Sequence, residues 1–451
     1  PITVVKVDQE TGKQIQAAGV EFRLLDSRKK PIEMEVYYPE HMKTSIFKTD
    51  KKGQFTFPQK LKKGQYYLEE VKAPEGYLKG ELLPFEVKEG ATWAEAQVIR
   101  YSNRSAKGKI VLQKIDQKTK ETLSGAVFEI FAAEDIVTAD QTVHAEKGEL
   151  VDTVEVSEKG GCSQNLYLGK YVVKEKKQPE GYVRLKKEYE VELKYKDQVT
   201  EIVTEELTVA NVPVTTELIK TDKKSGKPLE GVSFSVWKKE DEKLPKFEKK
   251  MYVTNQDGKI LLEYLKTGTY CIQEKKTLPG YLLSEQITEF TVDEEGYSEG
   301  KQRLCLKLEN EHTNIEVEKL DADTKKPVEG AVLQIEDLQG KVIVEKWKTE
   351  KEPKQIEKLP EGEYVLVEAE APFGYQKAEK MKFRVEPRKE VQKITLYNRK
   401  SEKEKLPEES TGRKDTPKTG DTATVAKLIA ALLGASLLLG LIYYRKRDRK
   451  R

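Results

Sequence analysis

Three kinds of polar side chain recur at fixed places along the chain, each on the apolar side of a strand-like segment. A Lys precedes an Asp by two residues in ITVVKVD, a Glu follows Tyr and Leu at alternate positions in GQYYLEEVKAPEGY, and an Asn ends VIRYSN. Alternation with a period of two places each of these residues on the same strand face as its aliphatic neighbours. The set recurs four times, as Lys6, Glu70 and Asn103; Lys114, Glu175 and Asn211; Lys220, Glu274 and Asn310; and Lys319, Glu368 and Asn398.

Inward-facing groups of these types have a chemistry that surface groups lack. A Lys is a nucleophile only when it is neutral, and burial lowers the pKa of its amine, whereas burial raises the pKa of a carboxyl group. The simpler interpretation is a buried Lys–Glu salt bridge, with the Asn satisfying leftover donors. A buried ion pair alone has no use for a recurrent Asn. We therefore expect a Lys, Glu, Asn triplet that acts as a unit in each repeat.

The elements that must position these triplets are short strands. Each repeat opens with the Lys-bearing strand, passes through a polar turn into a second strand, carries the Glu-bearing strand and ends with the Asn-bearing strand. Pro and Gly close the Glu-bearing segment with a turn. The spacing of about a hundred residues between copies indicates several small domains. Residues 28–48 and 132–156 vary most between copies, and we expect them to be surface loops.

Composition narrows the class of function. Charged residues make up 35% of the 451 residues, but the formal net charge is only +3, so the chain lacks the one-sided basic excess of a protein that binds nucleic acid. The three cysteines form no CxxC pair, and the three histidines are scattered, which argues against a disulfide framework and a zinc site. We expect no metal site and no cofactor.

The order of these landmarks resembles a known family. Lys-x-Asp, then GxYxLxExxAPxGY, then a closing Asn is similar to the collagen-adhesin B-type repeat (CnaB, SpaA-like or prealbumin-like domain) of Gram-positive surface proteins and pilins. The resemblance covers residues 1–399, with Gln178 and Leu278 replacing the Ala of the Ala-Pro pair. It implies an all-β fold, a tandem array of four immunoglobulin-like or prealbumin-like β-sandwiches. Their expected limits are residues 1–104, 105–213, 214–312 and 313–399.

The resemblance also implies what the triplets do. In that family the Lys amine and the Asn side-chain amide join in an intramolecular isopeptide bond, assisted by the Glu. A protonated Glu can hydrogen-bond the Asn carbonyl, make its carbon more electrophilic and move protons until ammonia leaves. Groups held in contact need no outside enzyme. We expect cross-linking in a single turnover and no enzyme activity.

The C-terminal residues form a pattern of three parts. Residues 400–421 are polar and contain Pro, which is typical of a disordered linker. Residues 422–444 include an uncharged apolar stretch expected to be a transmembrane helix, and residues 445–451, RKRDRKR, are expected to stay in the cytoplasm. Just before the apolar stretch stand Thr416, Pro417, Lys418, Thr419 and Gly420.

These five residues resemble the LPxTG cell-wall sorting signal, with Thr416 at the usual Leu position. The resemblance implies a sortase as partner, covalent attachment of Thr419 to a peptidoglycan precursor, and only a transient stay in the membrane. The alternative interpretation is a permanent membrane anchor.

These patterns predict a stalk on the cell wall of a Gram-positive bacterium that displays an N-terminal region. Because the sequence begins at Pro1 inside a strand-like segment, we expect a longer protein upstream. One alternative is a pilus subunit polymerised through a lysine, although EVYYPEHMK has Glu40 where the reactive Lys of a pilin motif would stand. Another is an adhesin that binds a host matrix protein through the loops of the first two repeats.

Overall fold

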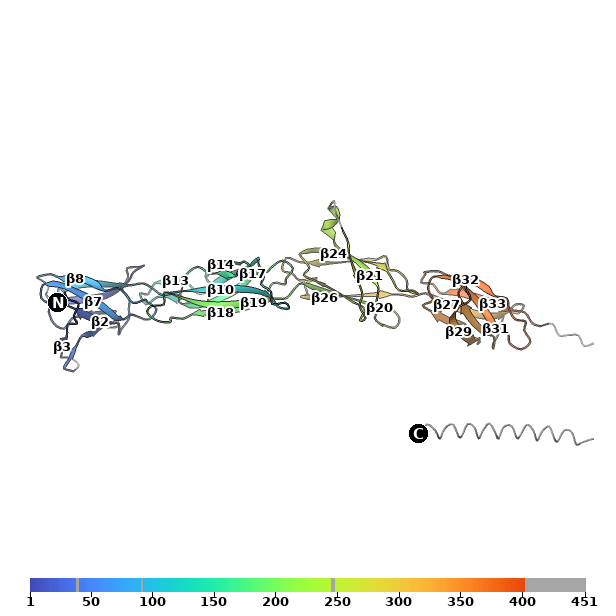
Figure 1. Ribbon diagram of the computed structural model, residues 1–451, viewed down its shortest axis with the longest axis horizontal. Helices are drawn as coiled ribbons and strands as arrows, with labels where there is room; N and C mark the ends of the chain where they lie inside the picture. Colours follow the sequence, from blue (N-terminus) through green and yellow to red (C-terminus); the bar gives the residue numbers. More distant parts are fainter. Residues whose placement is uncertain (38–39, 91, 245–247, 402–451) are drawn as a thin grey trace, which may run out of the picture. The chain divides into compact units, whose positions relative to one another are not determined.

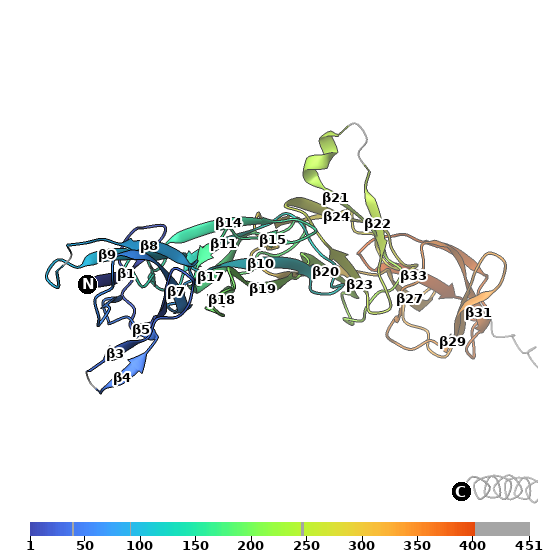
Figure 2. The ribbon, with the colours of Figure 1, turned by 60° about the vertical axis from the view of Figure 1, so that its left-hand side comes forward.

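The computed structural model describes residues 1–37, 40–90, 92–244 and 248–401. Within these ranges the regular elements are strands, apart from the short 3-10 helix η1 (Lys239–Lys243). Each of the four repeats contains two main sheets with a similar plan. Figures 1 and 2 show the strands of each repeat. One sheet holds the opening and closing strands, and the other is a four-stranded sheet that holds the Glu-bearing strand.

The first two repeats share this arrangement. In the first, the sheets have the orders β6-β1-β9 and β5-β2-β7-β8; in the second, β10 pairs with β15, β16 and β19, and the other sheet has the order β14-β11-β17-β18. The strands of the first repeat are β1 (Ile2–Asp8), β2 (Glu21–Leu25), β3 (Met34–Val36), β4 (Met42–Thr44), β5 (Ile46–Lys48), β6 (Gln54–Thr56), β7 (Gly64–Lys72), β8 (Leu83–Val87) and β9 (Gln97–Asn103). Those of the second are β10 (Lys107–Asp116), β11 (Ala126–Ala132), β12 (Ile136–Val137), β13 (Val143–Ala145), β14 (Leu150–Val156), β15 (Gly161–Cys162), β16 (Leu166–Tyr167), β17 (Gly169–Lys177), β18 (Glu188–Leu193) and β19 (Ile202–Asn211).

The last two repeats follow the same plan with fewer strands. Their sheets have the orders β23-β20-β26 and β22-β21-β24-β25 in the third repeat, and β30-β27-β33 and β29-β28-β31-β32 in the fourth. The strands of the third are β20 (Thr215–Asp222), β21 (Ser233–Lys238), β22 (Lys250–Val253), β23 (Lys259–Glu263), β24 (Gly268–Lys276), β25 (Ile287–Val292) and β26 (Arg303–Asn310). Those of the fourth are β27 (Asn314–Asp321), β28 (Val332–Glu336), β29 (Val342–Lys348), β30 (Lys354–Glu357), β31 (Gly362–Glu370), β32 (Met381–Val385) and β33 (Gln392–Asn398).

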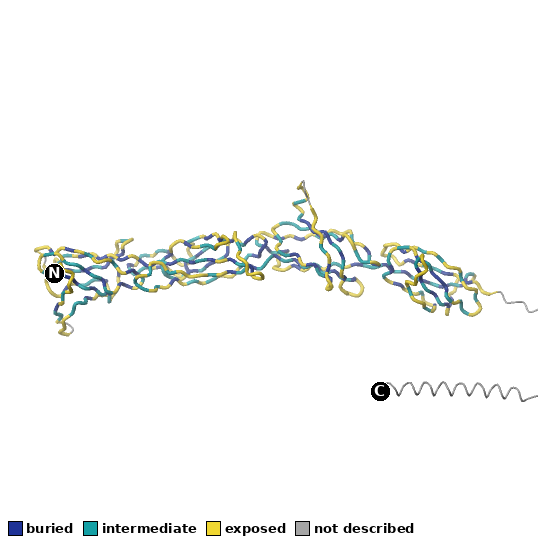
Figure 3. Tube along the Cα trace, in the orientation of Figure 1, coloured by how far each residue is buried: buried dark blue, intermediate teal, exposed yellow. Residues whose placement is uncertain are grey.

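Sequence alternation explains which residues form the cores. Along β27, NIEVEKLD, partly exposed and buried residues alternate over the whole length, so that Ile315, Val317 and Lys319 share the buried face. Each repeat has its own cluster of buried apolar residues contributed by both sheets. Figure 3 shows the buried positions recurring along the strands inside each repeat.

The opening and closing strands of each repeat are neighbours and run parallel. The register pairs Asp8 with Asn103, and the corresponding Asp and Asn are paired in the other three repeats. Because the Lys precedes the Asp by two residues, it lies on the same face as the Asn, one diagonal step away. The strand pairing therefore brings the two ends of each repeat together on one side of the core.

The two segments expected to be surface loops contain strands. Residues 28–48 hold the β3–β4 hairpin and β5, and residues 132–156 hold the β12–β13 hairpin and β14. Figure 2 shows the β3–β4 hairpin extending from the first repeat. The strands β3, β4, β12 and β13 were missed because they have only two or three residues each, too few for an alternating pattern, whereas β14 has seven residues and was taken for part of a variable loop.

The predicted sorting signal, transmembrane segment and basic tail lie outside the described residues. Residues 374–376 and 399–401 belong to a separate small unit. In that unit the Gln376 N–H donates to the Arg399 carbonyl at 2.8 Å and the Ser401 N–H to the Gly374 carbonyl at 2.9 Å. Over the ranges that the structure describes, it contains no helix of the length and apolar character needed to cross a membrane.

Candidate functional site

The structure brings all four predicted triplets together inside their repeats. The Lys and the Asn come from the parallel opening and closing strands, and the Glu comes from the facing four-stranded sheet. None of the twelve residues is more than 5% exposed. Lysine and glutamate are almost never buried so completely without a partner, so the contacts among the three decide what the site can do.

The contact between Glu and Asn is present in every repeat. The Asn Nδ2 donates to a carboxyl oxygen at 2.7 Å in Asn103–Glu70 and in Asn310–Glu274. In Asn211–Glu175 and in Asn398–Glu368 it lies 3.0 and 3.1 Å from the two carboxyl oxygens. All four distances are those of good hydrogen bonds.

The contact between Lys and Glu is less constant. The Lys6 Nζ is 2.7 Å from Glu70, and the Lys220 Nζ is 2.9 Å from Glu274. The corresponding distances are 3.9 Å for Lys114–Glu175 and 3.4 Å for Lys319–Glu368. The Lys114 Nζ donates to the Val209 carbonyl at 3.0 Å. Since a buried ion pair stabilises only when its geometry is excellent, a structural salt bridge does not explain what the four sites share.

Burial changes the ionisation of these groups. It lowers the pKa of Lys6, Lys114 and Lys319 to about 8, although the neighbouring Glu in each repeat acts in the opposite direction. It lowers the pKa of Lys220 as well. Burial raises the pKa of Glu175. These shifts favour a neutral amine, and in the second repeat also a protonated carboxyl group.

The Asn amide presents its nitrogen to the Glu. In the first repeat the Asn103 Nδ2 also donates to the Leu78 carbonyl at 2.6 Å, and in the second the Asn211 Nδ2 donates to the Val183 carbonyl at 3.0 Å. Two acceptors thus fix the position of the nitrogen. The Oδ1 atoms of Asn103, Asn211 and Asn310 are buried without a hydrogen-bond partner. The sequence argument expected the Glu at the amide oxygen, whereas this geometry places it at the nitrogen.

Backbone groups complete the sites, and the sequence argument missed them. The amide N–H ten residues after the Glu donates to its Oε2, from Gly80 at 2.7 Å, from Leu185 at 2.7 Å and from Ala378 at 2.5 Å. These donors differ in residue type because only their backbone is used. The one signal in the sequence is the constant spacing of ten residues from the Glu.

The site of the third repeat is built differently. The second acceptor for the Asn310 Nδ2 is the Thr277 hydroxyl, at 2.8 Å. A cavity of about 610 Å³ is lined by Lys220, Glu274 and Asn310, together with Ser284, which stands ten residues after the Glu. In the first repeat a cavity of about 670 Å³ includes Asn103 in its lining but neither Lys6 nor Glu70. The cavity thus borders all three members of the triplet in the third repeat and only the Asn in the first.

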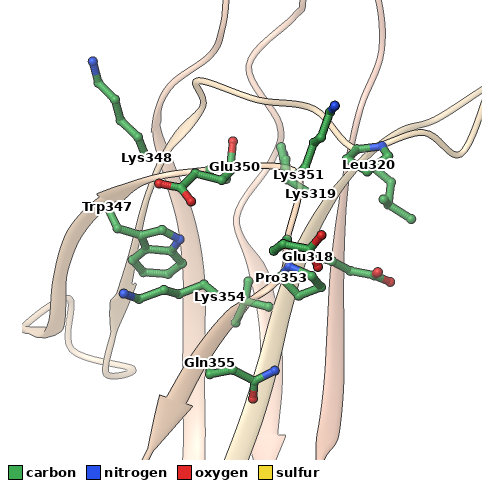
Figure 4. A pocket seen from close by; sticks show the side chains of 14 residues that line it. Glu318, Lys319, Leu320, Trp347, Lys348, Glu350, Lys351, Pro353, Lys354 and Gln355 are labelled. Atoms are coloured by element: carbon green, nitrogen blue, oxygen red, sulfur yellow. The ribbon is translucent and has the colours of Figure 1, made fainter.

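A different cavity lies beside the Lys of the fourth repeat. In the first repeat Gly53 adopts a φ of 76°, and its carbonyl accepts the Lys6 N–H at 2.9 Å. In the fourth repeat Lys354 pairs with Val317 as Phe55 pairs with Val4, which puts Pro353 next to this position, at the place of Gln54. Next to it is a cavity of about 470 Å³ lined by Lys319, Trp347 and Pro353. Figure 4 shows the labelled side chains around it.

Other chemistry was sought in the same described ranges. No three His, Cys, Asp or Glu side chains gather there in a way that could hold a metal ion. The cysteines Cys162, Cys271 and Cys305 are free thiols. The four triplets are thus the sites whose composition and burial indicate a chemical function.

Comparison with protein families adds an independent observation. The SpaA family model, a prealbumin-like fold domain, matches residues 1–99, 108–208, 214–302 and 313–400. The chain belongs to this family. The four matches confirm the predicted all-β architecture of four tandem prealbumin-like domains, which are called SpaA repeats below.

Several solved structures are similar to the chain. The Bacillus anthracis TIE protein is 21% identical over 88% of this chain and 73% of its own, with a TM-score of 0.38. The major pilin subunit of Bacillus cereus is 16% identical over 68% of this chain and 98% of its own, with a TM-score of 0.33. A streptococcal ancillary pilin is 18% identical over 66% of this chain and 100% of its own, with a TM-score of 0.29. No curated protein sequence matches the chain.

Proposed function

We propose that the chain is a cell-surface stalk in which each SpaA repeat closes an isopeptide bond between its Lys and its Asn. The observation that carries this proposal is the Glu–Asn hydrogen bond, which has good geometry in all four repeats while the Lys–Glu distance varies from 2.7 to 3.9 Å. A site that served only to bury a Lys would keep the Lys–Glu contact constant. The constant contact here involves the amide that the reaction consumes.

The proposed reaction needs no group beyond the triplet. The neutral Lys Nζ attacks the Asn Cγ, a new C–N bond forms, and the bond from Cγ to Nδ2 breaks. The proton lost by Nζ passes through the Glu to Nδ2, which leaves as ammonia. The Glu carboxyl group lies 2.7 to 3.1 Å from Nδ2, within reach for this transfer. Burial supplies the neutral amine, and the strand register supplies the proximity.

The position of the bond explains its benefit to a stalk. It would join the opening strand to the closing strand, and in the first repeat the closed loop would run from Lys6 to Asn103. The chain-entropy estimate for a loop of this size is about 4 to 5 kcal/mol. A pull on the two ends of a repeat would load this covalent bond before it separated the strands.

An intact-mass measurement on residues 1–399 tests the cross-links. The expected mass is lower than the sequence mass by four ammonias. Variants in which one Lys is changed to Arg are the matched controls, because each should regain one ammonia. A preparation at full sequence mass would contradict the proposal, and a smaller deficit would identify the repeats in which the bond does not form.

We further propose that Thr416 to Gly420 is a sorting signal through which a sortase attaches the stalk to peptidoglycan. The support is the order of motif, apolar stretch and basic tail in the sequence. In this reaction a sortase cysteine attacks the Thr419 carbonyl, Gly420 and all that follows are released, and the Thr419 acyl group passes to an amine of the wall precursor. The apolar stretch would hold the chain in the membrane only until that exchange.

Cell fractionation tests the anchor. The protein should be released by wall-digesting enzymes without detergent, and Thr419→Ala should shift it to the membrane or the medium. Thr411→Ala is the control, because Thr411 precedes the final Gly of the similar segment LPEESTG, whose spacing does not fit the signal. An unchanged distribution of Thr419→Ala, or an intact C-terminal Arg451 on the surface protein, would exclude sortase attachment.

A further inference from the structure

Thr277 occupies a place in the third repeat that other repeats fill with a different residue. It stands nine residues after Gly268, as Ala73 stands nine residues after Gly64. The turn that follows has the same hydrogen bond in both repeats, from the Tyr77 N–H to the Pro74 carbonyl and from the Tyr281 N–H to the Leu278 carbonyl. Thr277 and Ala73 are therefore structurally equivalent, and the difference between them is a hydroxyl and a methyl group.

The hydroxyl replaces an acceptor that the backbone supplies elsewhere. In the first two repeats the Asn Nδ2 has a backbone carbonyl as its second acceptor, from Leu78 or Val183. In the third repeat the Thr277 Oγ1 accepts from the Asn310 Nδ2 at 2.8 Å. Leu282, the counterpart of Leu78, still donates its N–H to the residue after the closing strand, Glu311, but it also borders the cavity.

We propose that Thr277 is a positioning residue for the cross-link of the third repeat, an inference that rests on the isopeptide function proposed above. Its hydroxyl holds the Asn310 nitrogen in contact with Glu274. The amide carbon is then kept in a fixed orientation toward Lys220 while that nitrogen takes up a proton and leaves as ammonia. Thr277 takes no part in the bonds that form and break.

The cavity gives this role its importance. In the first repeat Asn103 is held by Glu70 and a backbone carbonyl, and the cavity there borders Asn103 but neither Lys6 nor Glu70. In the third repeat the cavity reaches all three members of the triplet. Water in that space offers the Asn310 amide alternative hydrogen bonds and thus alternative orientations. Thr277 lies in the turn that follows the Glu-bearing strand. Its hydroxyl holds the Asn310 amide without help from the segment of Leu282, which borders the cavity.

The test compares three full-length chains that are recovered in denaturant before cross-linking and then diluted into folding buffer. They are the original chain, Thr277→Val, which removes the hydroxyl at nearly constant volume, and Thr277→Ser, which keeps it. The fraction of Lys220–Asn310 cross-linked peptide is followed by digestion and mass spectrometry over time. The cross-linked peptides of the other three repeats, in the same tube, report whether each chain has folded.

Thr277→Val should slow the third cross-link about three- to tenfold, the factor expected for one lost hydrogen bond. Thr277→Ser should stay within about twofold of the original chain, and Ala73→Thr in the first repeat should leave the first cross-link unchanged because Leu78 already supplies the acceptor. Thr277→Ser separates positioning from packing, because it keeps the hydroxyl and loses the methyl group of Thr277.

Each other outcome overturns the proposal. An unchanged rate for Thr277→Val, or a Thr277→Ser chain as slow as Thr277→Val, shows that the hydroxyl does not position the amide. These results leave the isopeptide function standing as long as the original chain forms the Lys220–Asn310 bond. If the original chain never forms it, both the proposed function of this repeat and the role of Thr277 fail.

Discussion

The first and third repeats hold the same triplet in different surroundings. Lys6 and Glu70 are fully enclosed, and the enclosing groups are the Leu78 carbonyl, the Gly80 N–H and the ring of Tyr101. Lys220 and Glu274 are also buried, but a cavity reaches them and a Thr hydroxyl replaces the backbone carbonyl. The contact between the Glu and the Asn has the same length, 2.7 Å, in both. The comparison of the two repeats shows that the Glu–Asn contact is the same while the residues that enclose it differ.

Gly80 accounts for part of the difference in how the two triplets are enclosed. A Cβ on Gly80 would lie 2.4 Å from Cε1 of Tyr101, so only Gly lets this segment approach both the ring and Glu70. The third repeat has Ser284 at the same spacing from its Glu and Leu308 at the place of Tyr101 in the strand register. A bulky ring paired with Gly thus closes one site, and the smaller Leu paired with Ser borders the cavity in the other.

Removing the Glu should have the largest effect on stability, and the size of this effect should differ between the first and third repeats. We expect Glu70→Ala and Glu274→Ala each to abolish the cross-link of its own repeat, with loss of about 4 to 5 kcal/mol of stabilisation from the closed loop. Glu70→Ala should destabilise further, by about 3 to 5 kcal/mol, because Lys6 would be left without its partner in an enclosed site. Lys220 can be hydrated from the cavity, so Glu274→Ala should cost less than Glu70→Ala.

Intact mass and trypsin resistance at rising temperature measure the two variants. Glu69→Ala is a matched control in the first repeat, since Glu69 neighbours Glu70 but is partly exposed and pairs with Arg23 at the surface. If a variant without its Glu kept the loss of ammonia, the carboxyl group would be structural only. Equal destabilisation of the two repeats would show that the cavity does not hydrate Lys220.

Changing a residue that encloses the triplet of the first repeat to its counterpart in the third should have an intermediate effect on stability. Gly80→Ser places a Cβ against the Tyr101 ring and should displace the Gly80 N–H from Glu70, at a cost of about 1 to 3 kcal/mol. Hydrogen exchange should show faster exchange in the peptide that contains residue 80. The reverse change, Ser284→Gly, should alter the third repeat by no more than about 1 kcal/mol because no close contact is relieved there. Equal changes in stability for Gly80→Ser and Ser284→Gly would contradict the explanation that Gly80 and Tyr101 together enclose the first triplet.

The sequence predicted the parts of the fold that depend on side-chain alternation. The Lys, Glu and Asn of each triplet were assigned to inward faces because apolar residues stand two positions away, and all twelve are buried. The four-fold repetition followed from copies of the Glu-bearing segment, and the family match confirms it. The role of these residues in cross-linking stays a prediction.

The missed features depend on backbone position or on very short elements. No pattern of residue types marks the Leu78 carbonyl or the Gly80 N–H, because any residue supplies these groups. The hairpins in residues 28–48 and 132–156 have strands too short to show a period. Thr277 was visible in the sequence, but the shifted Pro279 drew the alignment to Leu278 and hid its equivalence to Ala73.

The smallest expected difference between the first and third repeats lies in the pH dependence of bond formation. If the Glu delivers a proton to the leaving nitrogen, the reactive form has a neutral Lys and a protonated Glu. The unreactive form, with a charged Lys and an ionised Glu, contains the same number of protons as the reactive form. The ratio of these two forms therefore does not depend on pH, as long as the Lys–Glu pair as a whole does not lose a proton. Burial sets the upper limit of this range by lowering the pKa of Lys6 to about 8.

The rate in the first repeat should therefore be flat just below pH 8 and should fall about tenfold for each pH unit above that. Burial also lowers the pKa of Lys220, so the third repeat should show a profile of the same shape, with rates within about twofold of the first across the plateau. The measurement follows both cross-linked peptides after dilution of the denatured chain into buffers of different pH. A rate that rises tenfold per pH unit up to pH 8 in the first repeat would falsify the acid role, because it would mean that an ionised Glu suffices. Profiles of opposite shape would show that the cavity changes the chemistry and not only the position of the amide.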